Sequence, residues 1–366
     1  MNLLAGLDKK LIKYLIIAVS AVVGIFVIIF IVSLFKGNRL SFSELESELK
    51  NSAISYFESN GDLLPKVEGD KVRVNNLTLT ESGNMKSIDK ITKKGYTCVG
   101  EVEVQKNGAY YLYTPYLDCG KDYKTIKLVD KIKENNPIVT SDDGLYQIGE
   151  NLVFRGEIVN NYVQFSGKLW RIIRINSDGT LRLIQDNIDY TAVWDDRYNV
   201  NREDSTGYND FLISRLKDGL EKIYNDESLF NDSAKSKIVL KDICIGKRYV
   251  DETDNSGNVE CSNVVPNKPI GLMQVNEYMV ASLDSTCVHS YDHQCANYNY
   301  LSSYTKTTWT LTADASNTHK AYKFYGNSFD VSTASSETGI RLVIYLSDNL
   351  PYVSGTGTVD NPYIVK

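Results

Sequence analysis

Histidine is scarce in this sequence, with three residues in 366, beside only three tryptophans and four methionines. So few histidines leave little room for a multi-histidine metal centre or for histidine-based acid–base catalysis. An excess of positive charge is missing as well, because 40 Lys and Arg residues face 46 Asp and Glu residues, which gives a formal net charge of −6. Nucleic-acid-binding domains normally carry a basic face, so the composition predicts no nucleic-acid partner.

The motifs of the common enzyme classes are also missing. The sequence contains no glycine-rich phosphate loop, no nucleophile elbow and no zinc-protease helix. Two carboxylate pairs, Asp186/Asp189 and Asp195/Asp196, have the residue types that a glycosidase requires. Aspartates in loops more often form turns, so we predict no catalytic residues, no cofactor and no enzymatic activity.

One long apolar run is present at residues 14–35, and it contains no charged residue. It reaches the roughly 20 residues that cross a bilayer, whereas the apolar stretch of a cleaved signal peptide has only about 7–15. Lysines precede the run, which favours a cytoplasmic N-terminus. The sequence therefore predicts a single-pass protein of the cell membrane. Its expected parts are a cytoplasmic N-terminus at 1–13, a transmembrane helix that anchors it at 14–35, and an extracellular C-terminal region.

All six cysteines follow the apolar run, and an even number of cysteines suits an oxidising compartment. Pairing each cysteine with the nearest one predicts three disulfides, although spacing alone does not fix connectivity. These are Cys98–Cys119, Cys244–Cys261 and Cys287–Cys295. The last pair encloses His289 and His293, so a tetrahedral zinc site is the alternative there. We favour the disulfide, because thiols outside a cell tend to oxidise, and predict no metal ligand.

Calcium is a second metal alternative, at the polar loop of residues 250–260. Asp251, Asp254, Asn255 and Glu260 supply oxygen-bearing side chains, but their spacing differs from that of an EF-hand loop. We expect this loop to be solvated and free of metal.

A first domain is predicted at residues 40–120. Ser41 and Glu44 form a capping-box pattern, and apolar residues at helical spacing follow until Asn60-Gly61. Strands are then expected at 71–74, 99–104 and 109–117. This order is similar to that of pilins and pseudopilins, and the residues before Leu64-Pro65 resemble a pilin helix end. The apolar run lacks the glutamate of a pilin processing site. The resemblance implies a pilin-like stalk through which the chain could form a homo-oligomer.

A linker is predicted at residues 121–143, which are rich in Lys and Asp, and a second domain at 144–366. Alternating apolar and polar residues there predict antiparallel strands, whereas 3.6-residue periodicity predicts helices at 211–225 and after Asn276. The expected strands are 153–155, 162–165, 169–175, 181–184 and a central one at 340–346.

Several landmarks of this second domain resemble a surface-protein module of gut Firmicutes. They are the stretches 160–184, 269–278, 308–312, 339–344 and 355–363. One position departs from that pattern, since Leu342 stands where the module usually has proline. The resemblance implies the C-type-lectin-like fold that is shared with formylglycine-generating enzymes. The predicted fold class is therefore α+β: an N-terminal transmembrane helix, a small pilin-like α+β domain, and a C-type-lectin-like α+β domain with an antiparallel sheet.

The segment 291–336 is rich in Tyr, Ser, Thr and Asn, the composition that antibodies use for adaptable contact surfaces. Trp309 is expected to face inward as a supporting anchor. The tyrosines expected to be exposed and to contact a ligand are Tyr298, Tyr300, Tyr304, Tyr322 and Tyr325. The sequence thus predicts an adhesin-type surface protein whose head binds an extracellular protein or glycan. The alternatives are a pseudopilin-like structural or envelope-assembly subunit, and a polar surface without a partner.

Overall fold

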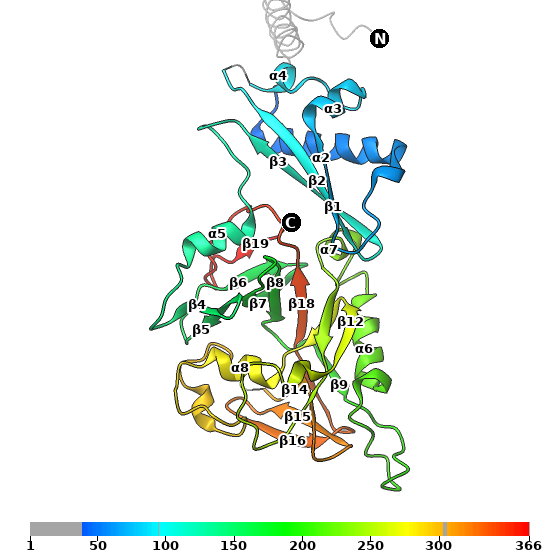
Figure 1. Ribbon diagram of the computed structural model, residues 1–366, viewed down its shortest axis with the longest axis vertical. Coiled ribbons are helices and arrows are strands. Elements are labelled where there is room, and N and C mark those ends of the chain that lie inside the picture. The colour runs from blue at the N-terminus through cyan, green and yellow to red at the C-terminus, as the bar shows by residue number, and fades with distance from the viewer. Residues whose placement is uncertain (1–38, 94, 303–305, 366) are drawn as a thin grey trace, which may run out of the picture. The chain divides into compact units, whose positions relative to one another are not determined.

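The computed structural model describes residues 39–93, 95–302 and 306–365 (Figure 1). These residues divide into two compact units, which are described here one at a time. The first unit comprises the described residues up to Gly61, together with Val74–Val102 and Pro115–Lys124. The second comprises Asp62–Arg73, Glu103–Thr114 and the chain from Thr125 onward.

The predicted fold class needs correction in its first element. Of the helices within 39–93, 95–302 and 306–365, none is long and apolar enough to cross a membrane. The expected span at residues 14–35 lies outside the described residues. The described residues form a sheet-rich α+β chain with several antiparallel sheets.

The described helices are α2 (Phe42–Ser59), α3 (Asn76–Glu81), α4 (Ile88–Ile91), α5 (Leu128–Asn135), α6 (Arg215–Tyr224), α7 (Asp232–Lys235) and α8 (Val275–Ala281). The first nine strands are β1 (Lys71–Asn75), β2 (Val99–Asn107), β3 (Tyr110–Asp118), β4 (Gly144–Ile148), β5 (Asn151–Arg155), β6 (Tyr162–Phe165), β7 (Lys168–Ile175), β8 (Leu181–Gln185) and β9 (Tyr190–Val193). They are followed by β10 (Lys241–Cys244), β11 (Lys247–Arg248), β12 (Val264–Lys268), β13 (Ile270–Leu272), β14 (Thr308–Asp314), β15 (Lys320–Phe324), β16 (Phe329–Thr333), β17 (Glu337–Ile340), β18 (Leu342–Leu346) and β19 (Tyr363–Ile364).

In the first unit, α2 is the predicted capped helix. The backbone N–H of Ser41 donates to Glu44 Oε2 at 2.6 Å, which satisfies a donor that the helix start leaves free. The apolar face of α2 is fully buried. Gly100 at the start of β2 lies against Leu49, because a Cβ atom at Gly100 would come within 2.5 Å of Leu49 Cδ1. The lack of a side chain at this position therefore lets the helix approach the strand.

A disulfide in the first unit joins Cys98, just before β2, to Cys119, just after β3. It confirms the pairing predicted for these two cysteines. The strands β1, β2 and β3 form a three-stranded sheet in that order. Gly108 adopts φ +60° between β2 and β3, a conformation that glycine takes at little cost, and this fits the predicted turn.

In the second unit, the larger sheet has the order β13-β18-β8-β7-β5-β4, and β6 joins it through β7 and β19. All five residues of β18 are buried. This strand lies between β13 and β8 and is antiparallel to both. The strand expected at 340–346 is present from Leu342 onward and lies inside the sheet, whereas Ile340 ends β17 of the other sheet.

A second sheet of this unit has the order β16-β15-β14-β17-β9, with β11 paired to β14. Every residue of β14 is buried. Two indole N–H groups join β14 to β9 and the residue after it: Trp309 Nε1 donates to the Ala192 carbonyl at 3.0 Å, and Trp194 Nε1, just after β9, donates to the Thr310 carbonyl at 3.1 Å.

The predicted linker at 121–143 contains α5, so the linker interpretation fails there. Leu128, Val129 and Ile132 of α5 are buried in the hydrophobic core of the second unit. The Leu128 N–H also donates to the Leu350 carbonyl at 2.7 Å. The charged residues of α5 itself lie outside its buried face, as in a short amphipathic helix.

Candidate functional site

Two of the five tyrosines predicted to contact a ligand are buried, and the expectation of exposure is wrong for them. Tyr300 and Tyr322 are each 1% exposed. The Tyr300 ring lies 4.6 Å from the guanidinium of Arg171, and the Tyr322 hydroxyl donates to the Arg248 carbonyl at 3.2 Å. Burial raises the pKa of both hydroxyls. These tyrosines therefore support the fold from inside.

Two others are exposed as predicted. The exposed fraction is 60% for Tyr298 and 44% for Tyr325. Tyr325 is oriented by a hydrogen bond between its hydroxyl and Ser332 Oγ at 2.9 Å. Tyr304 lies outside the described residues. Tyr291, which is 46% exposed, was not selected from the sequence although it lies in the same tyrosine-rich segment.

The loop that carries Tyr291 is closed by a disulfide between Cys287 and Cys295. The Tyr291 ring stacks on His289 with a centroid separation of 5.0 Å. Asp292 Oδ2 accepts the backbone N–H of His289 at 2.7 Å, which holds the loop from inside. Because both thiols are used in the disulfide, the zinc alternative lacks its two thiolate ligands.

This loop also contacts the hairpin of β15 and β16, since the Phe329 N–H donates to the Ser290 carbonyl at 3.0 Å. The hairpin carries Tyr325. We use the name tyrosine surface for the three exposed side chains of Tyr291, Tyr298 and Tyr325. Tyr291 lies in the disulfide-closed loop, Tyr325 lies in the turn of the β15–β16 hairpin, and the Tyr298 carbonyl accepts the Leu283 N–H at 3.2 Å.

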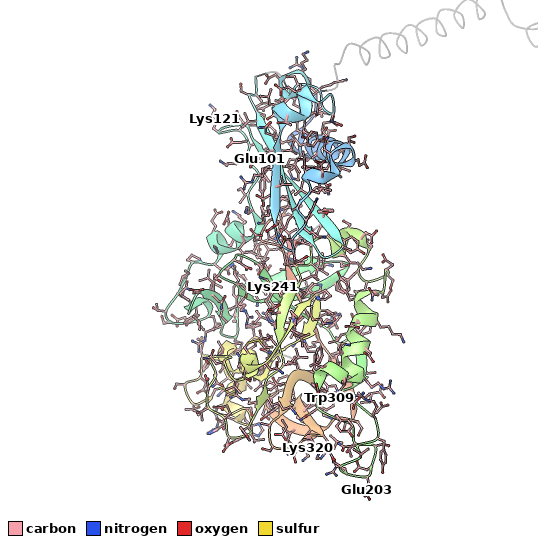
Figure 2. The ribbon with its side chains drawn as sticks, turned by 45° about the vertical axis from the view of Figure 1, so that its right-hand side comes forward. Glu101, Lys121, Glu203, Lys241, Trp309 and Lys320 are labelled. Carbon is pink, nitrogen blue, oxygen red and sulfur yellow. A yellow bond between two sulfur atoms is a disulfide. The ribbon has the colours of Figure 1, made fainter. Side chains whose placement is uncertain are left out.

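Trp309 is the buried anchor that the sequence predicted (Figure 2). The ammonium of Lys323 lies 5.3 Å from the centroid of the Trp309 ring and 5.6 Å from that of Tyr325. Both distances are within the range of cation–π attraction. Lys323 therefore connects a core residue to one exposed tyrosine.

The loop considered for calcium encloses an arginine. Arg248 Nη1 donates to the Asp254 carbonyl at 2.9 Å, and Nη2 donates to the Glu252 carbonyl at 2.9 Å and to Asn255 Oδ1 at 3.0 Å. Glu260 is the acidic partner of the same guanidinium. A side-chain cation thus occupies the centre of the loop, and the predicted Cys244–Cys261 disulfide is present there as well. Of the four residues considered for calcium, Asp251 is exposed and Asp254 and Asn255 are half-buried, whereas Glu260 is buried.

Sequence reasoning missed a pocket of about 290 Å³ in the second unit. Its lining combines apolar side chains with amides, a hydroxyl and charged groups. The lining residues are Ile148, Gly149, Glu150, Asn151, Val153, Ile173, Arg174, Asn255, Ser256, Asn276, Glu277 and Val280. We call it the α8 pocket, because the last three of these residues lie on α8. The only sequence signal was a pair of polar residues, Asn276 and Glu277, at the start of a helix whose other residues are mostly apolar.

Glu277, the buried acidic residue of this pocket, has ion-pair or hydrogen-bond partners at both carboxylate oxygens. Glu277 Oε1 lies 3.0 Å from Arg174 Nη1 and 2.5 Å from Arg182 Nε, and its Oε2 accepts Arg182 Nη2 at 2.8 Å and the Gln274 N–H at 3.0 Å. Burial alone would raise the pKa of Glu277. The charges of Arg182 and Arg174, with the hydrogen bonds, outweigh that effect and leave the pKa below its ordinary value. Glu277 is therefore ionised at neutral pH.

Asn276 differs from its neighbour. Asn276 is only 7% exposed, and its side-chain Oδ1 has no hydrogen-bond partner among the residues that the structure describes. A buried acceptor that loses water without a replacement costs about 1–3 kcal/mol. Asn276 Oδ1 is itself shielded from solvent, so this cost falls inside the fold and the atom is not open to a ligand in the pocket.

A second depression of about 420 Å³ adjoins the α8 pocket and shares Asn151 and Arg174 with it. Its lining includes Lys241 of β10, labelled in Figure 2, and Asp178, which form an ion pair.

Comparison of the chain with protein-family models, curated proteins and solved structures finds no match. The site must therefore be interpreted from its own geometry. That geometry offers a small pocket with a mixed apolar and polar lining and a separate set of exposed tyrosines.

Proposed function

We propose that this chain is an extracellular, adhesin-type binding protein whose second unit recognises a protein or glycan through the tyrosine surface. The observation that carries the proposal is the exposure of Tyr291, Tyr298 and Tyr325, of which Tyr291 lies in a disulfide-closed loop that contacts the hairpin of Tyr325. Tyrosine provides a large contact area at a small entropic cost, and rigid presentation lowers that cost further.

The extracellular location is supported by the three disulfides, which pair all six cysteines. Disulfides persist in oxidising compartments and are rare where thiols are kept reduced. The resemblance of the second domain to surface-protein modules also supports a binding role.

The test is an array of glycans and surface proteins probed with the full chain. A variant with Tyr291, Tyr298 and Tyr325 replaced by serine is compared with Tyr198→Ser, a control that removes an equally exposed tyrosine from another loop. We expect the triple variant to lose more than about 1 kcal/mol of binding free energy for each tyrosine that contacts the ligand. The control should bind like the parent. Equal binding by the triple variant would refute the proposed surface. Filaments without any array signal would favour the structural-subunit alternative.

A further inference from the structure

We infer that the partner of the second unit is a basic protein segment, which binds through lysine and arginine side chains on a surface wider than the three exposed tyrosines. The inference deepens the proposed function and rests on it, because it chooses between the protein and the glycan proposed there. It depends on which side chains three neighbouring loops expose and on which charges those loops lack.

The three loops belong to the second unit and lie next to one another. They are residues 156–161, 249–258 and 284–299. Gly156 of the first loop pairs with Asn299 of the third in a parallel bridge. Asn255 of the second loop donates from Nδ2 to the Val288 carbonyl of the third at 3.5 Å. We call the exposed side of these loops the acidic loop surface.

Each of the three loops exposes large apolar or aromatic side chains. Ile158 is the most exposed of them, at 82%, and Tyr249 is 56% exposed. The others are Val250, Val288, Tyr291 and Tyr298. Apolar and aromatic side chains form the centre of protein interfaces, with polar groups around them. Tyr249 lies outside the tyrosine surface, so it extends the aromatic area beyond the three tyrosines already described.

The charges of the loops are one-sided. The loops contain no lysine or arginine, and they carry six carboxylates. These are Glu157, Asp251, Glu252, Asp254, Asp284 and Asp292. None of the six is fully buried, and Glu157 and Asp251 are exposed. Exposed apolar and aromatic side chains thus alternate with negative charge.

The arginines that directly precede two of these loops do not neutralise this charge. Arg248 is fully buried and forms an ion pair with Glu260. Arg155 donates from Nε to the Val280 carbonyl at 2.7 Å and from Nη2 to the Ser282 carbonyl at 2.6 Å. A lysine or arginine of a partner would therefore meet unshielded carboxylates and tyrosine rings, and both attract cations. An uncharged glycan would leave the carboxylates without a counter-charge.

The test is fluorescence anisotropy of three labelled peptides mixed with the full chain. The peptides consist of six repeats of Arg-Gly, of Gln-Gly or of Glu-Gly. We expect the arginine peptide to bind at least about 10-fold more tightly than the glutamine peptide, and the glutamate peptide not to bind. The affinity for the arginine peptide should fall as the salt is raised from about 10 mM to about 150 mM. Equal affinities for the arginine and glutamine peptides would overturn the inference.

Charge variants locate the contact. Glu157→Gln/Asp251→Asn removes two exposed carboxylates from the acidic loop surface, whereas Glu203→Gln/Asp360→Asn removes the same charge from exposed positions outside the three loops. We expect the first variant to bind the arginine peptide about 5-fold more weakly than the parent, and the second to stay within about 2-fold. Equal weakening by both variants would mean that the peptide responds only to net charge, and the inference would fail.

Tyr249 tests the aromatic part without changing the three tyrosines of the proposed function. Tyr249→Ser and Tyr198→Ser remove tyrosines that are each 56% exposed. We expect only Tyr249→Ser to weaken the arginine peptide, by about 5-fold. If the two variants bind the peptide equally well, the acidic loop surface is not its site.

The same variants separate this inference from the proposed function. An uncharged glycan from the array may bind Tyr249→Ser and Glu157→Gln/Asp251→Asn as tightly as the parent, but not the triple tyrosine variant. That result would overturn the inference and leave the proposed function in place. If the arginine peptide and every array ligand bind the triple tyrosine variant as tightly as the parent, both fail.

Discussion

Arg248 and Glu260 form an ion pair in which both side chains are fully buried, with 3.2 Å between Arg248 Nη1 and Glu260 Oε1. The chain between them bends around the guanidinium and gives it two backbone carbonyls. Burial nonetheless raises the pKa of Glu260, because the attraction of Arg248 only partly offsets the loss of water. Arg248 Nε and Glu260 Oε2 have no partners within the described residues.

This pair predicts an asymmetric response to mutation. Glu260→Ala leaves a buried guanidinium without its counter-charge, and we expect a loss of about 3–5 kcal/mol in the free energy of unfolding. The double variant Arg248→Met/Glu260→Leu should recover most of that loss, because no buried charge remains. Urea denaturation of both variants measures the difference. If the double variant is no more stable than Glu260→Ala, the ion pair contributes more to stability than the apolar side chains that replace it.

Glu277 predicts how stability depends on pH. Its pKa is lowered in the folded state from an ordinary value of 4.5. A carboxyl of this kind contributes stability that is fully present above its unfolded pKa and is lost as the pH falls through the folded pKa. We expect the parent to lose thermal stability below pH 4.5 more steeply than Glu277→Gln, which has no carboxyl at this position. If the melting temperatures of the two proteins change in parallel between pH 3 and pH 7, Glu277 is not the source of the acid sensitivity.

Two of the disulfides predict different losses of stability when each is removed. Cys244 and Cys261 are 17 residues apart, so removing their bond by double alanine substitution should cost about 3 kcal/mol through the entropy of the unfolded chain. Cys287 and Cys295 are 8 residues apart, and their removal should cost somewhat less. That second variant should weaken binding at the tyrosine surface, because the loop of Tyr291 is no longer closed. Urea denaturation and array affinity distinguish the two effects, and equal binding by both variants would argue against a preorganised loop.

Trp309 and Tyr325 predict opposite phenotypes. Trp309→Ala should destabilise the second unit by about 3–5 kcal/mol, as large core truncations do. Tyr325→Ser should change stability by less than about 0.5 kcal/mol, because the ring is exposed, and should cost binding instead. Thermal melting and affinity for the array ligand are measured on both. A large drop in melting temperature for Tyr325→Ser would mean that its contact with Lys323 stabilises the fold.

Local patterns in the sequence were sufficient for much of the fold. The capping box at Ser41, the nearest-neighbour cysteine pairs and the apolar strand that became β18 each depend on residues close in sequence. The segment of α5 was misassigned because charged residues surround only three buried apolar positions. In such a short helix, the many charged residues hide the 3.6-residue spacing of the apolar ones.

The candidate sites were harder to predict for a different reason. Ala321 and Tyr322 are consecutive in β15 and point to opposite faces of the sheet, yet both are buried, so strand alternation does not separate inside from outside there. The α8 pocket combines the β4–β5 turn, the loop at Asn255 and the start of α8. No pattern within one of these segments indicates that the other two are adjacent.

The pairing of β8 with β18 has a consequence for biosynthesis. Arg182 and Tyr345, which face each other in these strands, are 163 residues apart. At a synthesis rate of about 5–20 residues per second, β8 therefore waits roughly 10–30 s for its partner strand. During that interval the edge of β8, whose five residues are all buried in the finished fold, stays open to mispairing with other chains. Translation speed and chaperone supply should thus govern the yield of this protein more than the stability of its finished fold.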